Sequence, residues 1–382
     1  MTNNTDKLLH GLVLPKRKKV SDVVTERHDI VLLFEAKKAN PNGDPDAENM
    51  PRIQPNTLKG LVTDVCLKRK IRNFFSIYKT NGDLKDSLED GYDIFIKENA
   101  ILQQLMEAKP IEDLAKAIFV EKYSQKIESW DAKKTKKAKG KKEDAKTDDN
   151  TEKQEEINPA EEKKQESYRD ALCKTYFDLR AFGGVISTEG PLKGSFYGQV
   201  RGPIQFSFAE SLDKVLQLDS TITRCCSTSK KEVEQSKKQS EGDEKTGGNR
   251  TMGRKYNIDY GLYRAHIYFS PAFAAKTRFT YFDLDNFLFA MTHMFTDDPS
   301  SNRSGMRVVG LVDFQHSRPL GNEHAHKLFD MVKVEKKDKD KEFPDSINDY
   351  WGNALKSNIN DEIMANQIIW DIPLKEDKAK NV

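Results

Sequence analysis

The sequence predicts an α+β fold in which strands and helices follow the order βαββαβ. Three observations predict it: short apolar runs typical of buried strands, amphipathic runs typical of helices, and two long polar segments that interrupt the order. The chain has 382 residues, which is enough for one large domain or two ordinary domains.

The first strand and the first helix are expected near the N-terminus. Residues 29–38 are apolar on both faces, as in a central strand of a sheet. Residues 58–75 carry apolar side chains at helical spacing, so we expect one helix there. Residues 92–129 and 166–182 are also expected to be helical, and a Gly-Gly pair ends the second segment.

The next part of the order has the alternation of strands. Polar and apolar side chains alternate over residues 203–208, which predicts a strand with Ile204, Phe206 and Phe208 facing the core. Residues 221–224 form a short β-type run.

The order closes with a strand, a helix and a strand. Residues 261–269 and 306–314 are predicted to be strands, and residues 281–296 a helix whose first turn is capped by Thr280 and Asp283. Without the helical insertion between residues 92 and 182, this order is the ferredoxin-like arrangement, which is also the fold of the RNA-recognition motif. The fold alone gives no function.

Two segments are too polar to pack. Residues 131–165 contain Ile157 as their one large apolar side chain, and residues 228–250 contain only Val233. Such segments cannot offset the entropy lost on ordering by burying apolar surface. We expect solvated linkers or mobile loops there.

The overall charge gives no argument for a polyanionic partner. The net charge is +2, with 32% charged and 36% hydrophobic residues. Outside the two polar segments and the tails 1–26 and 371–382, the chain carries 38 basic and 40 acidic residues. Any argument for nucleic acid must therefore come from local clusters of cations.

The chain is expected to be a cytoplasmic protein that contacts no membrane. No apolar run approaches the roughly 18 residues of a membrane span, and no signal peptide is visible. The four cysteines (Cys66, Cys173, Cys225 and Cys226) have no framework spacing, which favours free thiols in a reducing compartment.

A rigid turn follows the first strand. Residues 40–46 read NPNGDPD, and the two prolines that flank the Asn-Gly pair force a sharp turn. The loop is either a purely structural turn or a preorganised site that holds phosphate or ribose through Asn40, Asn42, Gly43 and Asp44. Asp44 and Asp46 could also bind Mg²⁺, although two carboxylates on a loop are unspecific.

The predicted helix at 58–75 and the segment before it are rich in cations: Arg52, Lys59, Lys68, Arg69, Lys70 and Arg72. Cations near the C-terminus of a helix complement its dipole, and this accounts for Lys70 and Arg72. It does not account for the others. We therefore expect Arg52, Lys59, Lys68 and Arg69 to contact phosphates.

Two further motifs combine arginine with glycine or tyrosine. Arg201 stands between two glycines, either as a surface residue of a β-turn or as a bidentate ligand of phosphate. Residues 250–264 interleave three tyrosines with cations, which suits a single-stranded nucleic acid as well as the half-buried edge of a strand. The cations assigned to RNA here are Arg254, Lys255 and Arg264, with Arg224 on the opposing strand.

Nothing in the sequence resembles a catalytic constellation or a cofactor site. His316, His324 and His326 fall close together but lack a third ligand at defined spacing, so structural histidines are expected. Motifs of nucleotide-binding loops, serine hydrolases and zinc proteases do not occur. We expect neither a metal nor a cofactor.

Several motifs resemble the backbone subunit of type I-C CRISPR Cascade, the Cas7 family. They lie in the same order along the chain, at residues 40–46, 50–53, 60–70, 180–185, 198–203, 252–255, 260–266, 321–322 and 325–329. The resemblance implies an RNA-recognition-motif palm, helical fingers and a β-hairpin thumb. It also implies copies that stack along a guide RNA (crRNA) and present it for pairing with target DNA, within a complex of other Cascade subunits.

The resemblance also implies a division of the chain. The expected parts are a flexible basic tail 1–27, palm 28–91, fingers 92–198 with the linker 131–165, a palm strand 199–208, a thumb 209–260 with a mobile tip 228–250, palm 261–340 and a C-terminal segment 341–382. The two thumb strands are expected at residues 221–224 and 250–255.

The expected role is structural and non-catalytic, with two rivals. Related proteins of the superfamily cut RNA with a loop aspartate and metal or with a histidine, and the candidates here are Asp44, Asp46 and His266. The other rival is an oligomeric scaffold that makes no contact with RNA.

Overall fold

The computed structural model describes residues 21–85, 89–124, 159–224, 251–353 and 355–375, together with positions 8–9, 12–13, 130, 226, 229 and 231. Most of the expected linker 131–165 and of the expected tip 228–250 lies outside these residues. Near the N-terminus, β1 (Leu8–Leu9) and β2 (Leu12–Val13) pair with each other. Residues 21–27 of the expected tail are part of the fold, because Val24 is buried and donates its N–H to Phe279 O at 3.1 Å.

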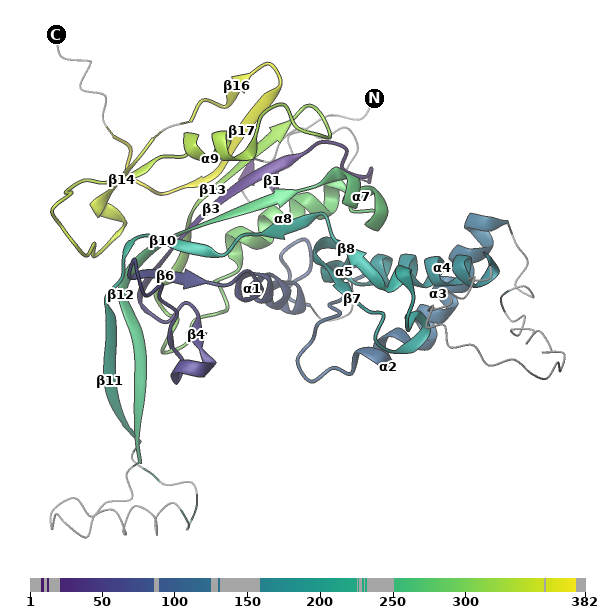
Figure 1. The fold of residues 1–382 in the computed structure, drawn as a ribbon, viewed down its shortest axis with the longest axis horizontal. Coiled ribbons are helices and arrows are strands. Elements are labelled where there is room, and N and C mark those ends of the chain that lie inside the picture. The colour runs from purple at the N-terminus through teal and green to yellow at the C-terminus, as the bar shows by residue number, and fades with distance from the viewer. Residues whose placement is uncertain are drawn as a thin grey trace, which may run out of the picture.

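The centre of the molecule is an antiparallel sheet (Figure 1). β3 (His28–Ala39) lies between β12 (Thr251–Phe269) and β13 (Met306–His316). The strands predicted at 29–38 and 306–314 are thereby confirmed. The remaining strands of this sheet are β6 (Lys59–Val62), β9 (Ile204–Phe206), β10 (Ala209–Lys214), β11 (Gln217–Arg224), β16 (Asn358–Asn360) and β17 (Ile363–Trp370).

Helices α1 (Asp64–Ile77) and α8 (Tyr281–His293) cover one face of the sheet. They contact each other, with the rings of Phe74 and Phe289 5.7 Å apart. The predicted capping box of α8 is confirmed, since the Thr280 side chain accepts from Asp283 N–H and the Asp283 carboxylate accepts from Thr280 N–H. In chain order β3, α1, β9, β12, α8 and β13 follow the predicted βαββαβ order.

The opposite face of the sheet is also covered. α9 (Ala325–Met331) and the small ribbon of β14 (Val334–Lys336) and β15 (Tyr350–Gly352) pack there, with the 3-10 turn η5 (Ile347–Asp349). Leu33 and Leu262 from the sheet meet Leu328 and Phe329 from α9 in this second apolar core. An RNA strand therefore cannot stack on this part of the sheet without displacing α9.

Helices α2 to α5 form a separate helical unit with its own apolar core. α3 (Lys109–Tyr123) packs on α4 (Pro159–Thr175), and α5 (Phe177–Phe182) leads back to the sheet. The other short elements are α2 (Leu102–Met106), β7 (Gly183–Val185), η3 (Gly190–Leu192), η4 (Phe196–Gly198) and β8 (Gln199–Arg201). No helix of the described residues is long and apolar enough to cross a membrane.

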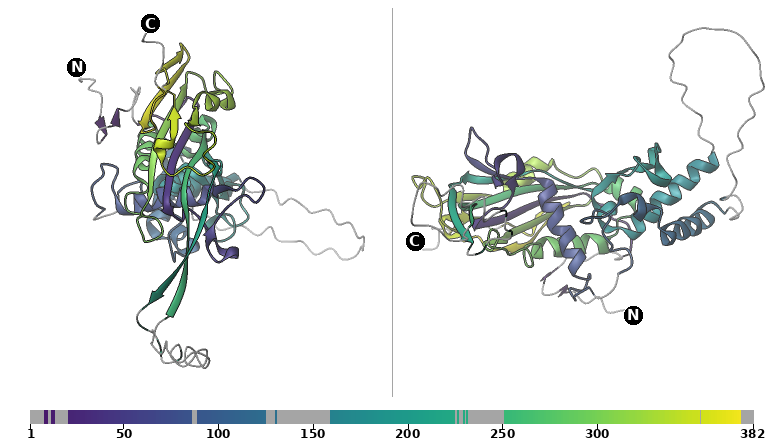
Figure 2. Two further views of the ribbon diagram at one scale, coloured as in Figure 1. Left: turned by 90° about the vertical axis from the view of Figure 1, so that its left-hand side faces the viewer. Right: turned by 90° about the horizontal axis from the view of Figure 1, so that it is seen from below.

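One β-hairpin leaves the sheet. β11 (Gln217–Arg224) pairs with the first half of β12, from Gln217 opposite Ile258 to Arg224 opposite Thr251. From Thr251 to Asn257, β12 pairs with β11 and with no other strand among the described residues. We call residues 217–224 and 251–257 the arm, and Figures 1 and 2 show it projecting away from the sheet.

Several predicted elements differ from the structure. The helix predicted at 58–75 begins only at Asp64, because residues 59–62 pair with β10 as a strand and Thr63 caps the helix. The helix predicted over 92–129 is two shorter helices, α2 and α3, and Pro110 lies in the first turn of α3, where a proline is tolerated. Residues 166–182 are parts of α4 and α5.

Two strand predictions also change. The strand at 203–208 ends at Phe206, so that Ile204 is buried and Phe206 is half-buried, but Phe208 is 57% exposed. The strand predicted at 261–269 is the second half of the much longer β12. The last part of the expected linker, from Pro159 onward, belongs to α4.

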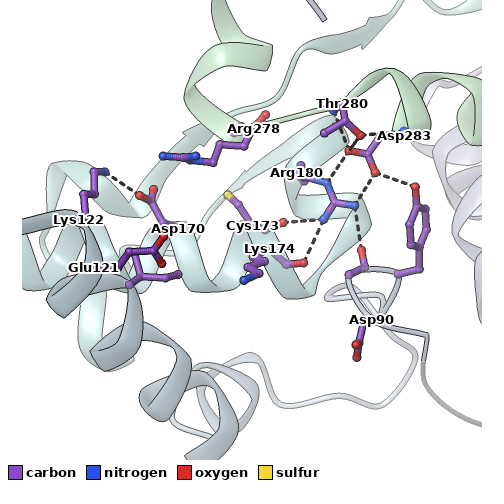
Figure 3. Close-up of a pocket in the computed structure, with 14 residues that line it drawn as sticks. Asp90, Glu121, Lys122, Asp170, Cys173, Lys174, Arg180, Arg278, Thr280 and Asp283 are labelled. Carbon is purple, nitrogen blue, oxygen red and sulfur yellow. Dashed lines mark hydrogen bonds and ion pairs between the residues drawn. The ribbon is translucent and has the colours of Figure 1, made fainter. Parts of the chain in front are cut away.

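A buried ion pair joins α5 to α8 (Figure 3). The Arg180 guanidinium donates to both carboxylate oxygens of Asp283 at 2.7 and 3.1 Å. It also donates to the backbone carbonyls of Gly91, Cys173 and Lys174. Tyr92 donates its hydroxyl to the same carboxylate at 2.7 Å.

We predict that Arg180→Ala lowers the free energy of unfolding by about 3–5 kcal/mol, because it leaves the Asp283 charge buried without its cation. Urea unfolding of the full chain measures this loss. The matched control is Lys193→Ala, which removes an exposed cation paired with Glu189 and should change stability by less than about 1 kcal/mol. Equal unfolding midpoints for the two variants would contradict the prediction.

Candidate nucleic-acid interface

The loop after β3 is a tightly bonded turn. It contains β4 (Gly43–Asp44), the 3-10 turn η1 (Pro45–Ala47) and β5 (Met50–Pro51). Asn40 donates its side-chain amide to Asn49 O at 2.7 Å. A Cβ at Gly43 would lie 2.9 Å from Asn49 O, so a side chain there would clash with the loop backbone.

Asn42 fixes this loop to helix α1. Its Oδ1 accepts from both the N–H and the hydroxyl of Thr63 at 3.0 Å. Thr63 is the N-cap of α1 and accepts from Cys66 N–H at 3.3 Å. The position of the loop is therefore set by the first turn of the helix.

Asp44 has a structural role in this loop. Its carboxylate accepts from Asp46 N–H at 3.3 Å at the start of η1 and lies 3.3 Å from Arg52 Nη2. Arg52 Nε is buried and has no partner among the described residues. Asp46 is exposed.

The base of the arm contacts the outer side of the same loop. Tyr256 donates its hydroxyl to the Glu48 carboxylate at 3.0 Å, and Gln217 donates to Pro51 O at 2.9 Å. A groove of about 480 Å³ lies between the loop and the arm. Arg254 lines this groove and is paired with Asp219 at 3.1 Å.

The cations of α1 fall into two groups. Lys70 and Arg72 are largely buried and form ion pairs with Asp298 and Asp178. These pairs, rather than the helix dipole assumed from the sequence, account for both residues. The second group consists of the predicted phosphate ligands Lys68 and Arg69. Lys68 lies 2.9 Å from Asp64, and its side chain is 12% exposed. Arg69 lies 3.1 Å from Glu98, and its side chain is 47% exposed.

Most of the predicted phosphate ligands already have a carboxylate partner. Lys59 lies 2.9 Å from the Glu210 carboxylate. The other four cations each lie within 3.3 Å of a carboxylate as well: Arg52, Lys68, Arg69 and Arg254. Ion pairs at exposed positions contribute only about 0–1 kcal/mol, so a phosphate can compete most readily for Arg69 and Arg254, whose side chains are exposed. The Lys68 side chain is largely buried, and its pair with Asp64 is harder to exchange. This pairing explains why the body of the chain has no basic excess.

Three other predicted residues lie apart from this group or have a different partner. Lys255 on the arm donates to Ser301 O. Arg224 is the last residue of β11, opposite Thr251. Arg201 is exposed on β8, next to the fingers, and forms no ion pair with a described residue.

Arg264 does not belong to the interface. Its guanidinium donates to Val332 O at 2.8 Å and to Phe329 O, and its Nε donates to His266 Nε2 at 2.9 Å. It therefore holds the C-terminal end of α9 against the sheet rather than facing solvent with the other cations. Its role depends on residues more than sixty positions further along the chain.

Of the three tyrosines interleaved with these cations, only Tyr256 lies on the arm. Tyr260 is buried and donates to Glu35 at 2.9 Å. Tyr263 is buried and stacks on Phe34 with ring centroids 5.2 Å apart. The sequence pattern thus combines two core residues with one surface residue.

The exposed Phe208 was missed as a candidate. Phe208 lies between β9 and β10. It is close to Thr63, the N-cap of α1, because the next residue, Ala209, pairs with Val62. Strict alternation along residues 203–208 suggested a core position. Its exposure follows from the end of the strand at Phe206, for which the sequence has no breaker residue.

His266 and His316 are shielded from solvent, whereas His324 and His326, which were also expected to be structural, are exposed at the start of α9. His316 is buried, with Nε2 3.0 Å from the Asp29 carboxylate, as expected from the sequence. His266 stacks on Phe329 with centroids 4.2 Å apart, and burial together with Arg264 lowers its pKa to about 4. Among the described residues no group of three His, Cys, Asp or Glu side chains could hold a metal.

We predict that His266 makes stability fall between about pH 6.5 and pH 4. The unfolded imidazole, with a pKa near 6.5, takes up a proton in this range, whereas the folded one stays neutral until about pH 4. In the His266→Gln variant this position takes up no proton in either state, so its stability does not change with pH for this reason. The free energy by which the wild type is more stable than the variant should therefore shrink as the pH falls. Urea unfolding at pH 7.5, 6, 5 and 4 measures it, and a constant difference would contradict the assignment.

Comparison with known proteins identifies the family. Two solved chains from assemblies titled "CRISPR RNA-guided surveillance complex, pre-nicking" and "CRISPR RNA-guided surveillance complex" are 12% and 9% identical, with TM-scores of 0.38 and 0.34. Each alignment covers 75% of this chain, and 78% and 68% of the other chain.

A curated relative from Haloferax volcanii, CRISPR-associated protein Cas7, is 38% identical over 72 residues. This match covers 19% of the present chain and 18% of the relative, so less than a fifth of the relative's length is matched. The family described as CRISPR-associated protein Cas7 matches over residues 26–354, which is most of the chain. The chain therefore belongs to the CRISPR-associated protein Cas7 family.

Proposed function

We propose that this protein is a guide-RNA-binding backbone subunit of a CRISPR RNA-guided surveillance complex of subtype I-C. Copies of the chain line up along the guide RNA, which remains available for pairing with target DNA, and other Cascade subunits complete the assembly in the cytoplasm. In this proposal the sheet with α1 and α8 is the palm, the helices α2 to α5 are the fingers, and the arm is the thumb.

One observation carries the proposal: the arm, the loop at residues 40–52 and helix α1 are joined at one place. The loop is bonded to α1 through Asn42 and Thr63 and to the arm through Glu48 and Tyr256. Their junction gives a preformed surface beside a projecting hairpin, which suits a strand that must be held and interrupted.

The charges of this surface suit a strand that is bound without reading its sequence. In guide-RNA complexes, sequence is read by base pairing, and the protein needs only contacts to backbone and shape. Arg52, Lys59, Lys68, Arg69 and Arg254 can each exchange a carboxylate for a phosphate, whereas Asn40, Asn42, Gly43 and Asp44 shape the loop. Lys255 and Arg224 remain proposed contacts of the guide. Arg201 remains a proposed nucleic-acid contact, but it lies apart from this surface, beside α7. Arg264 is left out because its donors are used at α9.

The geometry gives no support to the ribonuclease alternative. Asp44 is engaged by Asp46 N–H and Arg52. His266 has a pKa of about 4 and accepts a hydrogen bond from Arg264, so it holds no proton to donate near neutral pH. We propose a non-catalytic role.

We predict that the protein purified from cells that express its guide array carries RNA of one short length. The absorbance ratio at 260 and 280 nm should exceed that of free protein, and a denaturing gel should show a uniform band. A scaffold without RNA contact predicts the opposite: assemblies that survive nuclease treatment and carry no discrete RNA. The same gel analysis decides between them.

We predict that Lys68→Ala combined with Arg69→Ala weakens guide binding and reduces its dependence on salt. Each phosphate neutralised on a single strand contributes roughly 0.7 to the slope of log affinity against log salt, so the slope should fall by about 1.4. Filter binding over a range of salt measures it. The matched control, Lys109→Ala with Lys327→Ala, removes two exposed cations of α3 and α9 and should keep the slope. An unchanged slope in the first variant excludes these two residues as phosphate ligands.

A further inference from the structure

A groove runs between the fingers and the short helix α7 (Pro271–Thr277), away from the loop, α1 and the arm. It consists of two hollows of about 610 and 540 Å³. Both are lined by Lys122 and Asp170 from the fingers and by Thr277 and Arg278 from the end of α7, so the two hollows adjoin each other. Figure 3 shows the first of them.

The second hollow carries an excess of positive charge, whereas the four cations and four acids that line the first hollow cancel. Lys122 and Arg169 are neutralised by Glu166 and Asp170, which contact both cations at 3.3 Å or less. The second hollow has three more cations and no further acid: Arg201, Lys276 and Arg278. Its local net charge is therefore +3.

The three additional cations differ from those of the proposed guide surface. Arg201, Lys276 and Arg278 are exposed and form no ion pair with any described residue. The ammonium group of Lys276 lies 5.9 Å from the centre of the Phe273 ring. Three unpaired cations around one hollow repel each other in the free protein, and a polyanion would relieve that repulsion.

The conformation of Arg278 holds its side chain at the groove. Arg278 ends α7 in the left-handed region, with φ of 58°, and donates its N–H to Ala274 O. This position at a helix end favours glycine or asparagine, so an arginine there is conformationally unfavourable. In Figure 3 its guanidinium extends into the hollow toward Asp170 and Lys122.

An aromatic ring completes the same hollow. Phe196 lines it with a side chain that is 78% exposed. The turn η4 holds this ring, because Ser195 caps the turn by accepting from Tyr197 N–H at 3.1 Å. Cations beside an exposed ring are the combination that binds a single strand, whose phosphates pair with the cations and whose bases stack on the ring.

We propose that this groove binds a single-stranded nucleic acid other than the guide. Phosphates of this strand contact Arg201, Lys276 and Arg278, and a base stacks on Phe196. The inference rests on the proposed function, which places the guide along the loop, α1 and the arm. An acidic protein segment could satisfy the cations, but it would have no use for the exposed ring.

The test uses the full chain loaded with its guide and two labelled homopolymers that cannot pair with it, oligothymidylate and oligouridylate of about 20 nucleotides. The variants are Lys276→Gln with Arg278→Gln, and separately Phe196→Ala. The control is Lys109→Gln with Lys327→Gln, which removes the same charge elsewhere. Thermal unfolding and the guide content of each variant are measured in parallel, and polyglutamate serves as the acidic-peptide probe.

We expect the charge variant to bind homopolymer about tenfold more weakly, with a salt slope lower by about 1.4. Phe196→Ala should weaken homopolymer binding at least fivefold but leave polyglutamate binding unchanged. If the variants bind both homopolymers more weakly, the groove is a site for DNA or RNA. If they bind only one of the two more weakly, the groove is a site for that kind of nucleic acid. The guide content should stay at the wild-type level in every variant.

Three results would overturn the proposal. Unchanged homopolymer binding in folded charge variants removes the groove as a site. A lower guide content shows that the groove belongs to the guide path, whereas guide-free wild-type protein points to failure of the proposed function itself. Equal loss of polyglutamate binding in Phe196→Ala assigns the groove to an acidic protein partner.

Discussion

The continuity of strand β12 is the constraint on which the other features depend. Its second half pairs with β3 over the full length of the central strand, from Ile258 opposite Ala39 to Phe269 opposite His28. Its first half is one side of the arm. One unbroken strand therefore joins the arm to the sheet, and the arm begins where the pairing of β12 with β3 ends.

The same strand explains why the loop and α1 can meet the arm. The loop follows β3, the direct neighbour of β12, and so leaves the sheet where the arm begins. Asn42 then holds α1 on one side of the loop, and Tyr256 reaches Glu48 on the other. The loop, α1 and the arm therefore meet at the place where β3 ends and where β12 leaves its pairing with β3.

Both the strand order and the best-marked helix could be predicted from the sequence. The apolar run at 29–38 and the capping pair Thr280 and Asp283 are local signals, and local signals survive folding. The strand at 59–62 could not be recognised, because four residues of a short edge strand also fit the helical spacing of the segment that follows.

The candidate site was predictable only in part, for a different reason. The residue types of the loop, α1 and the arm are visible in the sequence, but their partners are not. Arg264 looks like Arg254 in its local context, yet it bonds to α9, while Arg254 faces Asp219. Exposed rings such as Phe196 and Phe208 carry no pattern, because their exposure depends on where neighbouring strands and turns end.

The Arg180–Asp283 contact has a mechanical consequence. One guanidinium ties three backbone carbonyls and a carboxylate from α8 together, and both charged side chains are almost fully buried. Moving α5 away from α8 would break both hydrogen bonds to Asp283 and leave two buried charges without their partner. We therefore expect α5 and α8 to move as one rigid body.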